Sequence, residues 1–213
     1  KFKNDPQGLK IAEKLLAYDT GKKFWKSNEI CIRHAEGIRS NTPVLAKLWY
    51  FWTNHFTISD TQSLANFSTG AYQREFIRAN MDKKFETMAV DATIAWPMMM
   101  HLDNKDNVGP KSKSAKSEWR RREKKPATIN ENHARELLEL HTVSPNASYT
   151  QEDIIELAKI MTGWRPKWSK QKDHGHDVSF DTDRHEPGKK TIFGKVYKRG
   201  SKSLKIVIKD LAN

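Results

Sequence analysis

The sequence predicts a mainly α-helical protein: a multi-helix, bundle-like domain with a small C-terminal part rich in loops and β-hairpins. Apolar residues recur at helical spacing as far as Trp164, and beyond it they come in short runs between Gly, Pro, Asp and His. Of the 213 residues, 37% are hydrophobic and 30% are charged, which is enough apolar material for one core. We therefore expect residues 1–213 to form a single helical domain, as a fragment of a larger protein.

The first half of the chain is expected to be helical in five segments. They are Pro6–Asp19, Asn28–Ile38, Pro43–Ser59, Tyr72–Asn80 and Lys83–His101. Gly21 is expected to end the first helix, and Pro97 to kink or restart the last. The third segment is the strongest candidate for a core helix because it has a wide apolar face made of Leu45, Leu48, Trp49, Trp52 and Phe56.

Two helices and several short strands are expected in the second half. The helix at Asn130–His141 has Leu137, Leu138 and Leu140 on its buried side, and the helix at Tyr149–Trp164 follows it. Thr150 is placed to cap the second of these helices, with Asp153 completing a capping box. The small strands or hairpin are expected at the apolar runs Val178–Phe180, Thr191–Phe193 and Leu204–Ile208.

One strongly basic stretch interrupts this pattern. The formal net charge is +12, and residues 111–125 (KSKSAKSEWRRREKK) hold eight basic and two acidic residues, about half of the excess. We expect a flexible insertion at residues 105–128. Its candidates for binding anionic polymers are Lys111, Lys113, Lys116, Arg120, Arg121, Arg122, Lys124 and Lys125. The alternative interpretation is a solvated loop without a partner.

Several classes of site are excluded. The only cysteine, Cys31, allows neither an intrachain disulfide nor a cysteine-rich zinc site. No stretch of about 18 apolar residues is present, so we expect no transmembrane segment in this piece. The Walker, Rossmann, HExxH and GxSxG patterns are absent, as is any sequence-specific nucleic-acid-binding motif.

The helix at Asn130–His141 carries the most polar face. Glu131, Arg135 and Glu139 follow one another at intervals of four, so they share a face, and Glu136 precedes Glu139 by three. One interpretation is an exposed, purely structural ladder of ion pairs. In the other, Glu136 and Glu139 project into a cleft, with Arg135 holding one carboxylate. There they act as general acid and base or bind a divalent metal ion.

Histidines supply the remaining candidates. His55 shares connected faces with Trp52 and Phe56, so its imidazole is expected to point inward beside aromatic rings. A hydrogen-bonded core histidine explains this position, whereas a catalytic or metal-binding role requires a carboxylate, for which the Asn130–His141 helix is the expected donor. Within that helix, His133 is expected to be exposed. His141 lies at the helix C-terminus, where the helix dipole favours a protonated imidazole, and this is a sufficient structural reason for a histidine there.

A loop rich in histidine and aspartate offers a further metal site. Residues 173–188 (DHGHDVSFDTDRHEPG) contain His174, His176 and His185 together with several carboxylates. These side chains can chelate zinc or calcium. However, the calcium-loop pattern is absent, and no helix orients His174 and His176 as a pair of ligands. The alternative is a polar, turn-rich loop, and His185 joins His55, Glu136 and Glu139 as a candidate metal ligand.

Several strings of this sequence together resemble one bacterial family, named domain of unknown function eighteen hundred. They are FWTNHF (51–56), LDN (102–104), NENHARELLELHT (130–142), YTQEDIIELAKIMTGW (149–164) and HEPGKKTIFGKVY (185–197). The resemblance covers about Leu45 to Ala212, and the basic run is longer than the usual linker at that point. It implies a larger, mainly helical protein, often made with an export signal and so periplasmic or extracellular. No reaction is implied.

Three functions remain open from the sequence. The first is an exported enzyme whose site joins His55, Glu136 and Glu139, with His185 and a divalent metal ion as further members. The second is a structural or partner-binding protein in which the shared strings serve packing and capping. The third is a module that binds polyanions or nucleic acid through the basic insertion.

Overall fold

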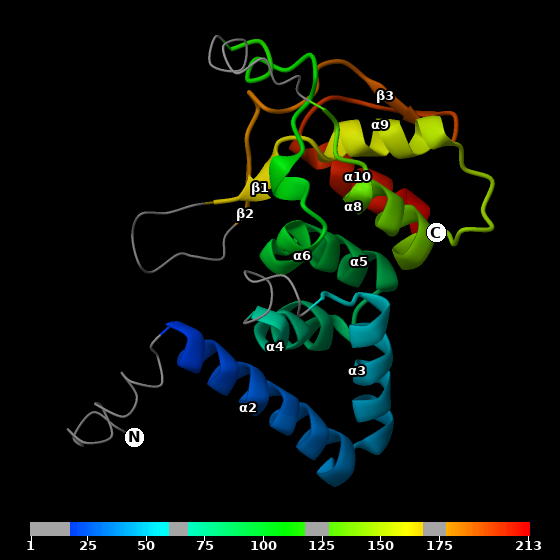
Figure 1. Cartoon of the computed structure of the whole chain (residues 1–213). Helices are drawn as coiled ribbons and strands as arrows, with labels where there is room; N and C mark the ends of the chain where they lie inside the picture. Colours follow the sequence, from blue (N-terminus) through cyan, green and yellow to red (C-terminus); the bar gives the residue numbers. More distant parts are fainter. Residues whose placement is uncertain (1–17, 60–67, 118–127, 168–177) are drawn as a thin grey trace. The chain divides into compact units, whose positions relative to one another are not determined.

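The computed structural model describes residues 18–59, 68–117, 128–167 and 178–213 (Figure 1). These residues are mainly helical and form two small antiparallel sheets of two strands each, so the predicted mainly α class is confirmed. The chain divides into two compact units, Lys1–Ala79 and Asn80–Asn213. The single bundle-like domain expected for the whole chain stays a prediction. Within the described ranges, no helix combines the length and the apolar character that a membrane span requires.

The first part of the chain is built from consecutive helices. They are α2 (Tyr18–Arg39), α3 (Pro43–His55), α4 (Thr69–Tyr72), the π-helix η2 (Gln73–Ile77) and the 3-10 helix η3 (Arg78–Asn80). The helix expected at Pro6–Asp19 lies almost entirely outside the described residues. The expected stop at Gly21 is wrong because α2 continues through it, and a single helical glycine costs only about 1 kcal/mol.

Helix α3 buries a narrower face than its sequence predicts. Trp49 and Phe56 are buried, and the Trp49 indole donates a hydrogen bond to the Gln73 carbonyl oxygen (3.1 Å). Leu45 and Leu48, which were expected in the core, are instead 53% and 44% exposed. The helix therefore has two apolar faces, and only the one containing Trp49 packs within its own unit.

The C-terminal unit contains more elements than the first. Its helices are α5 (Phe85–Ile94), α6 (Trp96–His101), the 3-10 helix η4 (Asn104–Asp106), α8 (Asn132–Glu136), the π-helix η5 (Leu137–Thr142), α9 (Gln151–Met161) and α10 (Ser201–Leu211). Its strands are β1 (Trp164–Pro166), β2 (Val178–Phe180), β3 (Lys190–Ile192) and β4 (Lys195–Tyr197). The predicted restart at Pro97 is confirmed, since the extended Ala95 (ψ 139°) separates α5 from α6.

Helix α9 begins as its sequence predicts. The Thr150 hydroxyl accepts a hydrogen bond from the Asp153 amide (3.2 Å), and the Asp153 carboxylate accepts one from the Thr150 amide (2.8 Å). The chain leaves α9 through Gly163, whose φ of +87° suits glycine. A Cβ at Gly163 would also lie only 2.6 Å from the Asp181 carbonyl oxygen, so this turn requires glycine.

The C-terminal part forms two hairpin-like strand pairs and a helix. β1 pairs antiparallel with β2 in the register Trp164↔Phe180, and β3 pairs with β4 in the register Lys190↔Tyr197. The strand expected at Leu204–Ile208 is wrong because these residues lie in α10. Their β-branched side chains suggested a strand, but Leu204, Val207 and Ile208 are buried with the spacing of one helix face.

Two buried asparagines join η4 to the end of α9. The Asn104 amide donates to the carbonyl oxygens of Met161 (3.3 Å) and Trp164 (2.9 Å). The Asn107 amide donates to the Ala158 carbonyl oxygen (2.9 Å) and the Asn104 side-chain oxygen (3.1 Å). Carbonyl groups near a helix C-terminus lack helical partners. The two asparagine side chains therefore supply hydrogen-bond donors to carbonyl groups at the end of α9.

Candidate carboxylate site

The polar helix that carries the candidate carboxylates is fixed at its start. The Asn130 side-chain oxygen accepts a hydrogen bond (3.0 Å) from the backbone amide of Asn132, the first residue of α8. The Asn130 backbone amide donates to the Asn107 side chain (3.1 Å), and the Asn130 amide group donates to the Asp103 carbonyl oxygen (3.1 Å). The turn at residues 103–107 therefore fixes the start of α8, and through Asn107 it also caps the end of α9.

The predicted helix changes type halfway along. α8 ends at Glu136 and continues as the π-helix η5, in which one turn holds more residues than an α-helical turn. This widening buries His141 and leaves Leu140 59% exposed, so the expected burial of Leu140 is wrong. π-Helical turns occur frequently at functional sites, which directs attention to the side chains at this junction.

The expected ladder is present on the outer face of α8 and η5. The Arg135 guanidinium makes ion pairs with Glu131 (3.2 Å) and Glu139 (3.1 Å), and it also donates to the Gln151 side chain (3.0 Å). All three charged side chains keep part of their surface in water. Such pairs contribute only about 0.5 kcal/mol each, so the ladder serves mainly to hold Glu139 in place.

Glu136 differs from its neighbours in the ladder. It is half-buried, and within the described part of the chain its carboxylate makes no hydrogen bond or ion pair. Burial and then the neighbouring Glu139 carboxylate raise the pKa of Glu136 above its usual value, and Arg135 opposes this increase. Tyr149 lies nearby, where burial and the Glu139 charge raise its pKa as well. The site thus holds one carboxylate bound to arginine beside one without a partner.

His133 was expected to be exposed, and this expectation is wrong. Its side chain is buried, and neither ring nitrogen has a hydrogen-bond partner within the described ranges. Burial, together with the nearby His141 and His101, lowers the pKa of His133 to about 3. His133 is therefore a neutral core residue at pH 7. The spacing of His133 and Leu137 on one helix face is a sequence signal that indicates this burial.

His185 is buried and hydrogen-bonded through both ring nitrogens. Its Nδ1 lies 2.7 Å from the Thr162 carbonyl oxygen, which can only accept, so Nδ1 carries the proton. Its Nε2 accepts a hydrogen bond from the Gly200 amide (3.3 Å). Burial also lowers the pKa of His185 to about 4. These contacts explain His185 as a structural residue that joins the end of α9 to the start of α10.

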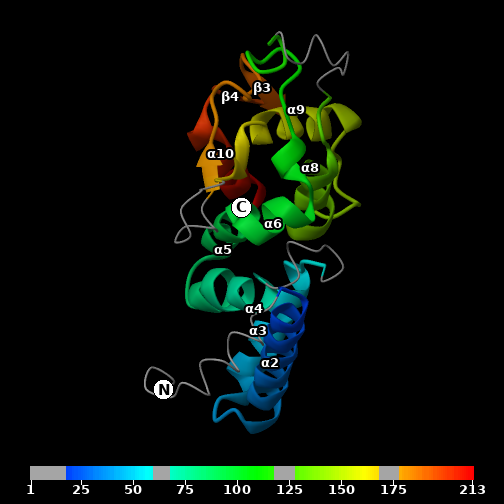
Figure 2. The ribbon, with the colours of Figure 1, turned by 60° about the vertical axis from the view of Figure 1, so that its left-hand side comes forward.

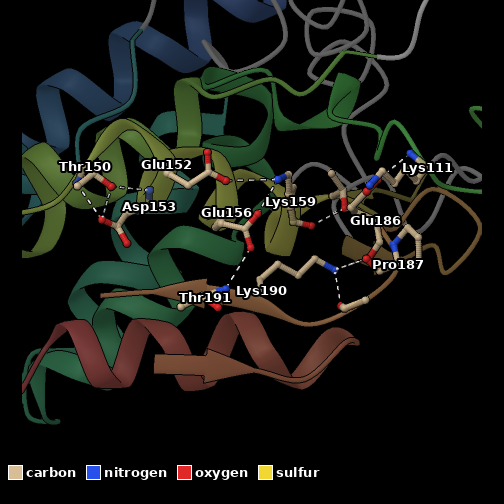
Figure 3. A network of polar contacts seen from close by, with 12 residues as sticks. Lys111, Thr150, Glu152, Asp153, Glu156, Lys159, Glu186, Pro187, Lys190 and Thr191 are labelled. Carbon is tan, nitrogen blue, oxygen red and sulfur yellow. Dashed lines mark hydrogen bonds and ion pairs between the residues drawn. The ribbon is translucent and has the colours of Figure 1, made fainter. Parts of the chain in front are cut away.

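The string that follows His185 is held by a network of polar contacts (Figure 3). The buried Lys190 ammonium donates to the carbonyl oxygens of Glu186, Pro187 (3.4 Å) and Gly188 (2.9 Å). The Glu186 carboxylate accepts a hydrogen bond from the Lys111 backbone amide (2.8 Å). These contacts close the turn before β3 and fix it against residue 111.

The same network joins strand β3 to helix α9, which lie alongside each other (Figures 1 and 2). The Glu156 carboxylate accepts from the Thr191 backbone amide (3.0 Å), and Asp153 accepts from the Phe193 amide (2.8 Å). The Lys159 ammonium donates to Glu156 (2.5 Å). Asp153, Glu156 and Lys159 of α9 therefore help to hold the β3–β4 strand pair against the helix.

His55 lies in the N-terminal unit, at the end of α3. Its ring is half-buried between aromatic side chains, with its centroid 4.7 Å from Phe56 and 5.6 Å from Trp52. These contacts match the aromatic surroundings that the sequence predicts. Glu136 and Glu139 belong to the C-terminal unit, so the expected meeting of this imidazole with these carboxylates stays a prediction.

The candidate metal and polyanion residues are distributed over several segments. His174 and His176 lie outside the described residues, and among the residues described no group of three or more His, Cys, Asp or Glu is arranged to hold a metal ion. Lys111, Lys113 and Lys116 are exposed, and Lys113 makes an ion pair with Asp183 (3.3 Å). The other basic candidates, also outside the described residues, are Arg120, Arg121, Arg122, Lys124 and Lys125.

The first part of the expected insertion is tied to the rest of the unit. The Gly109 amide donates to the Arg184 carbonyl oxygen (2.9 Å), and the Ser114 amide donates to that of Asp183 (2.8 Å). Asn107 and Ser112 are buried. Residues 105–117 therefore pack onto the segment around His185, and the polyanion-binding role of this region stays a prediction.

Comparison with known proteins places the whole arrangement in one family. The model of the family described as Protein of unknown function (DUF1800) matches residues 16–213. This range includes both compact units in large part, the ladder on α8 and η5, and the network around His185. Neither a curated protein nor a solved structure matches the chain significantly. The resemblance expected from the sequence strings is confirmed, and the chain belongs to the family Protein of unknown function (DUF1800).

Proposed function

We propose that the chain is part of an enzyme in which Glu136 and Glu139 act as general acid and base. The observation that carries this proposal is the different surroundings of two neighbouring carboxylates. Glu139 is bound to Arg135, whereas Glu136 is half-buried, without a partner in the described ranges, and has a raised pKa. Adjacent acids in unlike surroundings are typical of acid–base pairs, because one is kept protonated more readily than the other.

The roles follow from these surroundings. Glu136, whose pKa is raised, is the proton donor, because a carboxyl group must hold its proton near the working pH in order to deliver it. Glu139, held by the hydrogen bond from Arg135, accepts a proton from water or from a substrate hydroxyl. The reaction class is therefore a hydrolysis or a related proton-assisted group transfer. Arg135 is a positioning residue.

The pKa of Glu136 tests this proposal directly. In the full chain with ¹³C-labelled glutamate, titration followed by NMR should give Glu136 a higher pKa than the chain's exposed glutamates. Glu139→Gln should bring that pKa down, because it removes a negative neighbour. Glu131→Gln is the matched control, since it removes another carboxylate bound by the same arginine. An ordinary pKa for Glu136 would contradict the proposal.

Activity measurements with a panel of chromogenic esters, phosphate esters and glycosides provide the second test. Glu136→Gln should reduce any turnover by about 100-fold or more, because a positioned acid contributes roughly that much. Glu131→Gln should change turnover by less than about threefold, since its effect is confined to a surface ion pair. Equal losses in both variants would indicate a purely structural ladder.

A structural or partner-binding role is the second candidate. It is favoured by the number of polar residues in the shared strings that serve the fold, among them Asn104, His185 and Lys190. This role predicts that Glu136→Gln and Glu139→Gln leave every measured turnover unchanged while Asn107→Ala destabilises the protein. The two candidates are thus separated by the same set of variants.

A fuller form of the proposal adds His55 and a divalent metal ion to the carboxylates, in a protein exported from the cell. His185, the other candidate ligand, is left out because both of its ring nitrogens are hydrogen-bonded. Elemental analysis of the purified full-length protein and of the His55→Ala and Glu136→Ala variants tests the metal. Unchanged metal content in both variants would remove these residues as ligands. Export is tested by fractionation of cells that carry the full-length gene, where the protein is expected outside the cytoplasm.

A further inference from the structure

The tip of the hairpin formed by α2 and α3 exposes an unusual amount of apolar surface. Along α3, Val44, Leu48 and Phe51 follow one another at helical spacing and are 70%, 44% and 57% exposed. Leu45 adds to this stripe, and Ile38, at the end of α2, is 81% exposed. We call these five residues the apolar tip. Trp49 on α3 and Phe56 directly after it are already buried within the unit.

A hollow lies beside the apolar tip. It has a volume of about 510 Å³ and is lined by Ile30, Arg33, His34, Gly37, Ile38 and Tyr50. The Arg33 guanidinium lies over the Tyr50 ring, with 5.0 Å between Cζ and the ring centroid. The Ile38 side chain belongs to both features, so the hollow combines an apolar wall with an arginine and a histidine.

The charges around the apolar tip are of one sign. Residues 37–56 contain Arg39 and Lys47 but no aspartate or glutamate. Farther back along α2, Glu29 and Glu36 make ion pairs with Arg74 and, at 3.0 Å, Arg78. Glu29 and Glu36 are therefore neutralised, whereas Arg39 and Lys47 are exposed.

We propose that the apolar tip docks onto a membrane surface that contains anionic phospholipids. Contiguous exposed apolar patches with a polar rim mark protein or membrane contacts, and here the rim is cationic. Aliphatic and aromatic side chains enter the boundary between headgroups and acyl chains, while Lys and Arg are attracted to anionic headgroups. Lys47 can extend its alkyl chain along the apolar surface and keep its ammonium at the phosphates. Arg33 places a positive charge at the hollow beside the imidazole of His34, an arrangement that fits one phosphate headgroup.

A second copy of the chain is the competing occupant. In a twofold-symmetric dimer the same patch would meet itself, so Arg39 and Lys47 of one copy would face those of the other. No acid within residues 37–56 offsets this like-charge contact, and like charges across an interface are costly. Charge complementarity therefore favours the anionic membrane over self-association.

Co-sedimentation of the full chain with lipid vesicles tests this proposal. Vesicles of phosphatidylcholine alone should bind little protein, and vesicles that also contain phosphatidylglycerol should bind much more. The variant Val44→Ser/Leu48→Ser/Phe51→Ser keeps the net charge and should lower the partition coefficient by at least about tenfold, because the apolar surface it removes is substantial. These side chains are exposed, so circular dichroism should show an unchanged fold.

Two further variants separate the apolar tip from the general charge of the protein. Phe193→Ser/Val196→Ser/Ile206→Ser removes three other exposed apolar side chains, all in the C-terminal unit, and should leave binding unchanged. Arg39→Gln/Lys47→Gln should weaken binding more than Lys202→Gln/Lys205→Gln, which removes two exposed charges from α10.

Two outcomes would overturn the proposal. One is an equal effect of the matched variants on vesicle binding, which would show that net charge alone is responsible. The other is a concentration-dependent dimer that the Val44→Ser/Leu48→Ser/Phe51→Ser variant abolishes, together with no vesicle binding, which would assign the apolar tip to a second copy. Neither measurement depends on Glu136, so this proposal and the proposed acid–base site fail or succeed separately.

Discussion

At the scale of single residues, burial distinguishes structural polar groups from candidate chemical ones. Asn107 and His185 are buried and make hydrogen bonds with the backbone that the surrounding turns need. Glu136 keeps part of its surface in water, has a raised pKa, and has no partner among the residues described. A side chain with no structural role is the more informative one, because nothing in the fold accounts for its presence.

His133 should make the stability of the protein depend on pH. Its pKa of about 3 in the folded state lies below the value of about 6.5 expected in the unfolded chain. The unfolded state therefore binds the proton first, and the folded state loses stability as pH falls through the range from about 6.5 towards 3. The loss is limited to about 1.4 kcal/mol per pH unit.

Urea unfolding between pH 7 and pH 5 measures this effect. His133→Leu should flatten the dependence of the unfolding free energy on pH, because it removes the buried imidazole that resists protonation. A variant that keeps the wild-type slope would show that His133 does not titrate as the buried imidazole described above.

At the scale of secondary structure, local signals were reliable where the backbone itself sets the limit. Thr150 and Asp153 cap α9 because their side chains reach amide groups of the same turn. Pro97 restarts the helix because its ring prevents continuation. The π-helix η5 is different, since nothing in LLELHT distinguishes it from an α-helix, and its widened turn places His141 inside.

Substitutions in α10 test its helical assignment. In a strand at residues 204–208, alternate side chains including Ile206 would be buried together, whereas in the helix Ile206 is exposed and Ile208 is buried. Ile208→Ala should therefore lower the unfolding free energy by about 2–4 kcal/mol, and Ile206→Ala by less than about 0.5 kcal/mol. Equal losses in the two variants, measured by chemical denaturation, would contradict the helix.

At the scale of the whole molecule, the charge of the chain is concentrated in few places. Residues 111–125 hold about half of the net charge of +12, and α10 adds exposed lysines at 202, 205 and 209. Gly109 and Ser114 hold the start of residues 111–125 to the rest of the unit, because their backbone amides donate hydrogen bonds to Arg184 and Asp183. We propose that any affinity of the chain for polyanions would come from these two stretches.

Binding to heparin or duplex DNA should fall steeply with salt if the basic run is a binding site. The logarithm of the affinity should decrease with the logarithm of the salt concentration, by about 0.9 for each phosphate neutralised. Arg120→Gln/Arg121→Gln/Arg122→Gln should reduce this slope more than Lys202→Gln/Lys205→Gln/Lys209→Gln does. Equal reductions would show that only the total charge matters.

The sequence alone determined the mainly helical class, the caps and breaks of several helices, the family, and the ladder around Arg135. Each of these depends on short-range spacing along the chain, which the residues themselves specify. Only the tertiary structure decided that Leu45 and Leu48 are exposed, that His133 is buried, and that residues 204–208 are helical. Burial depends on which distant segments pack together, so an apolar or polar side chain has the same local pattern whether a partner covers it or not.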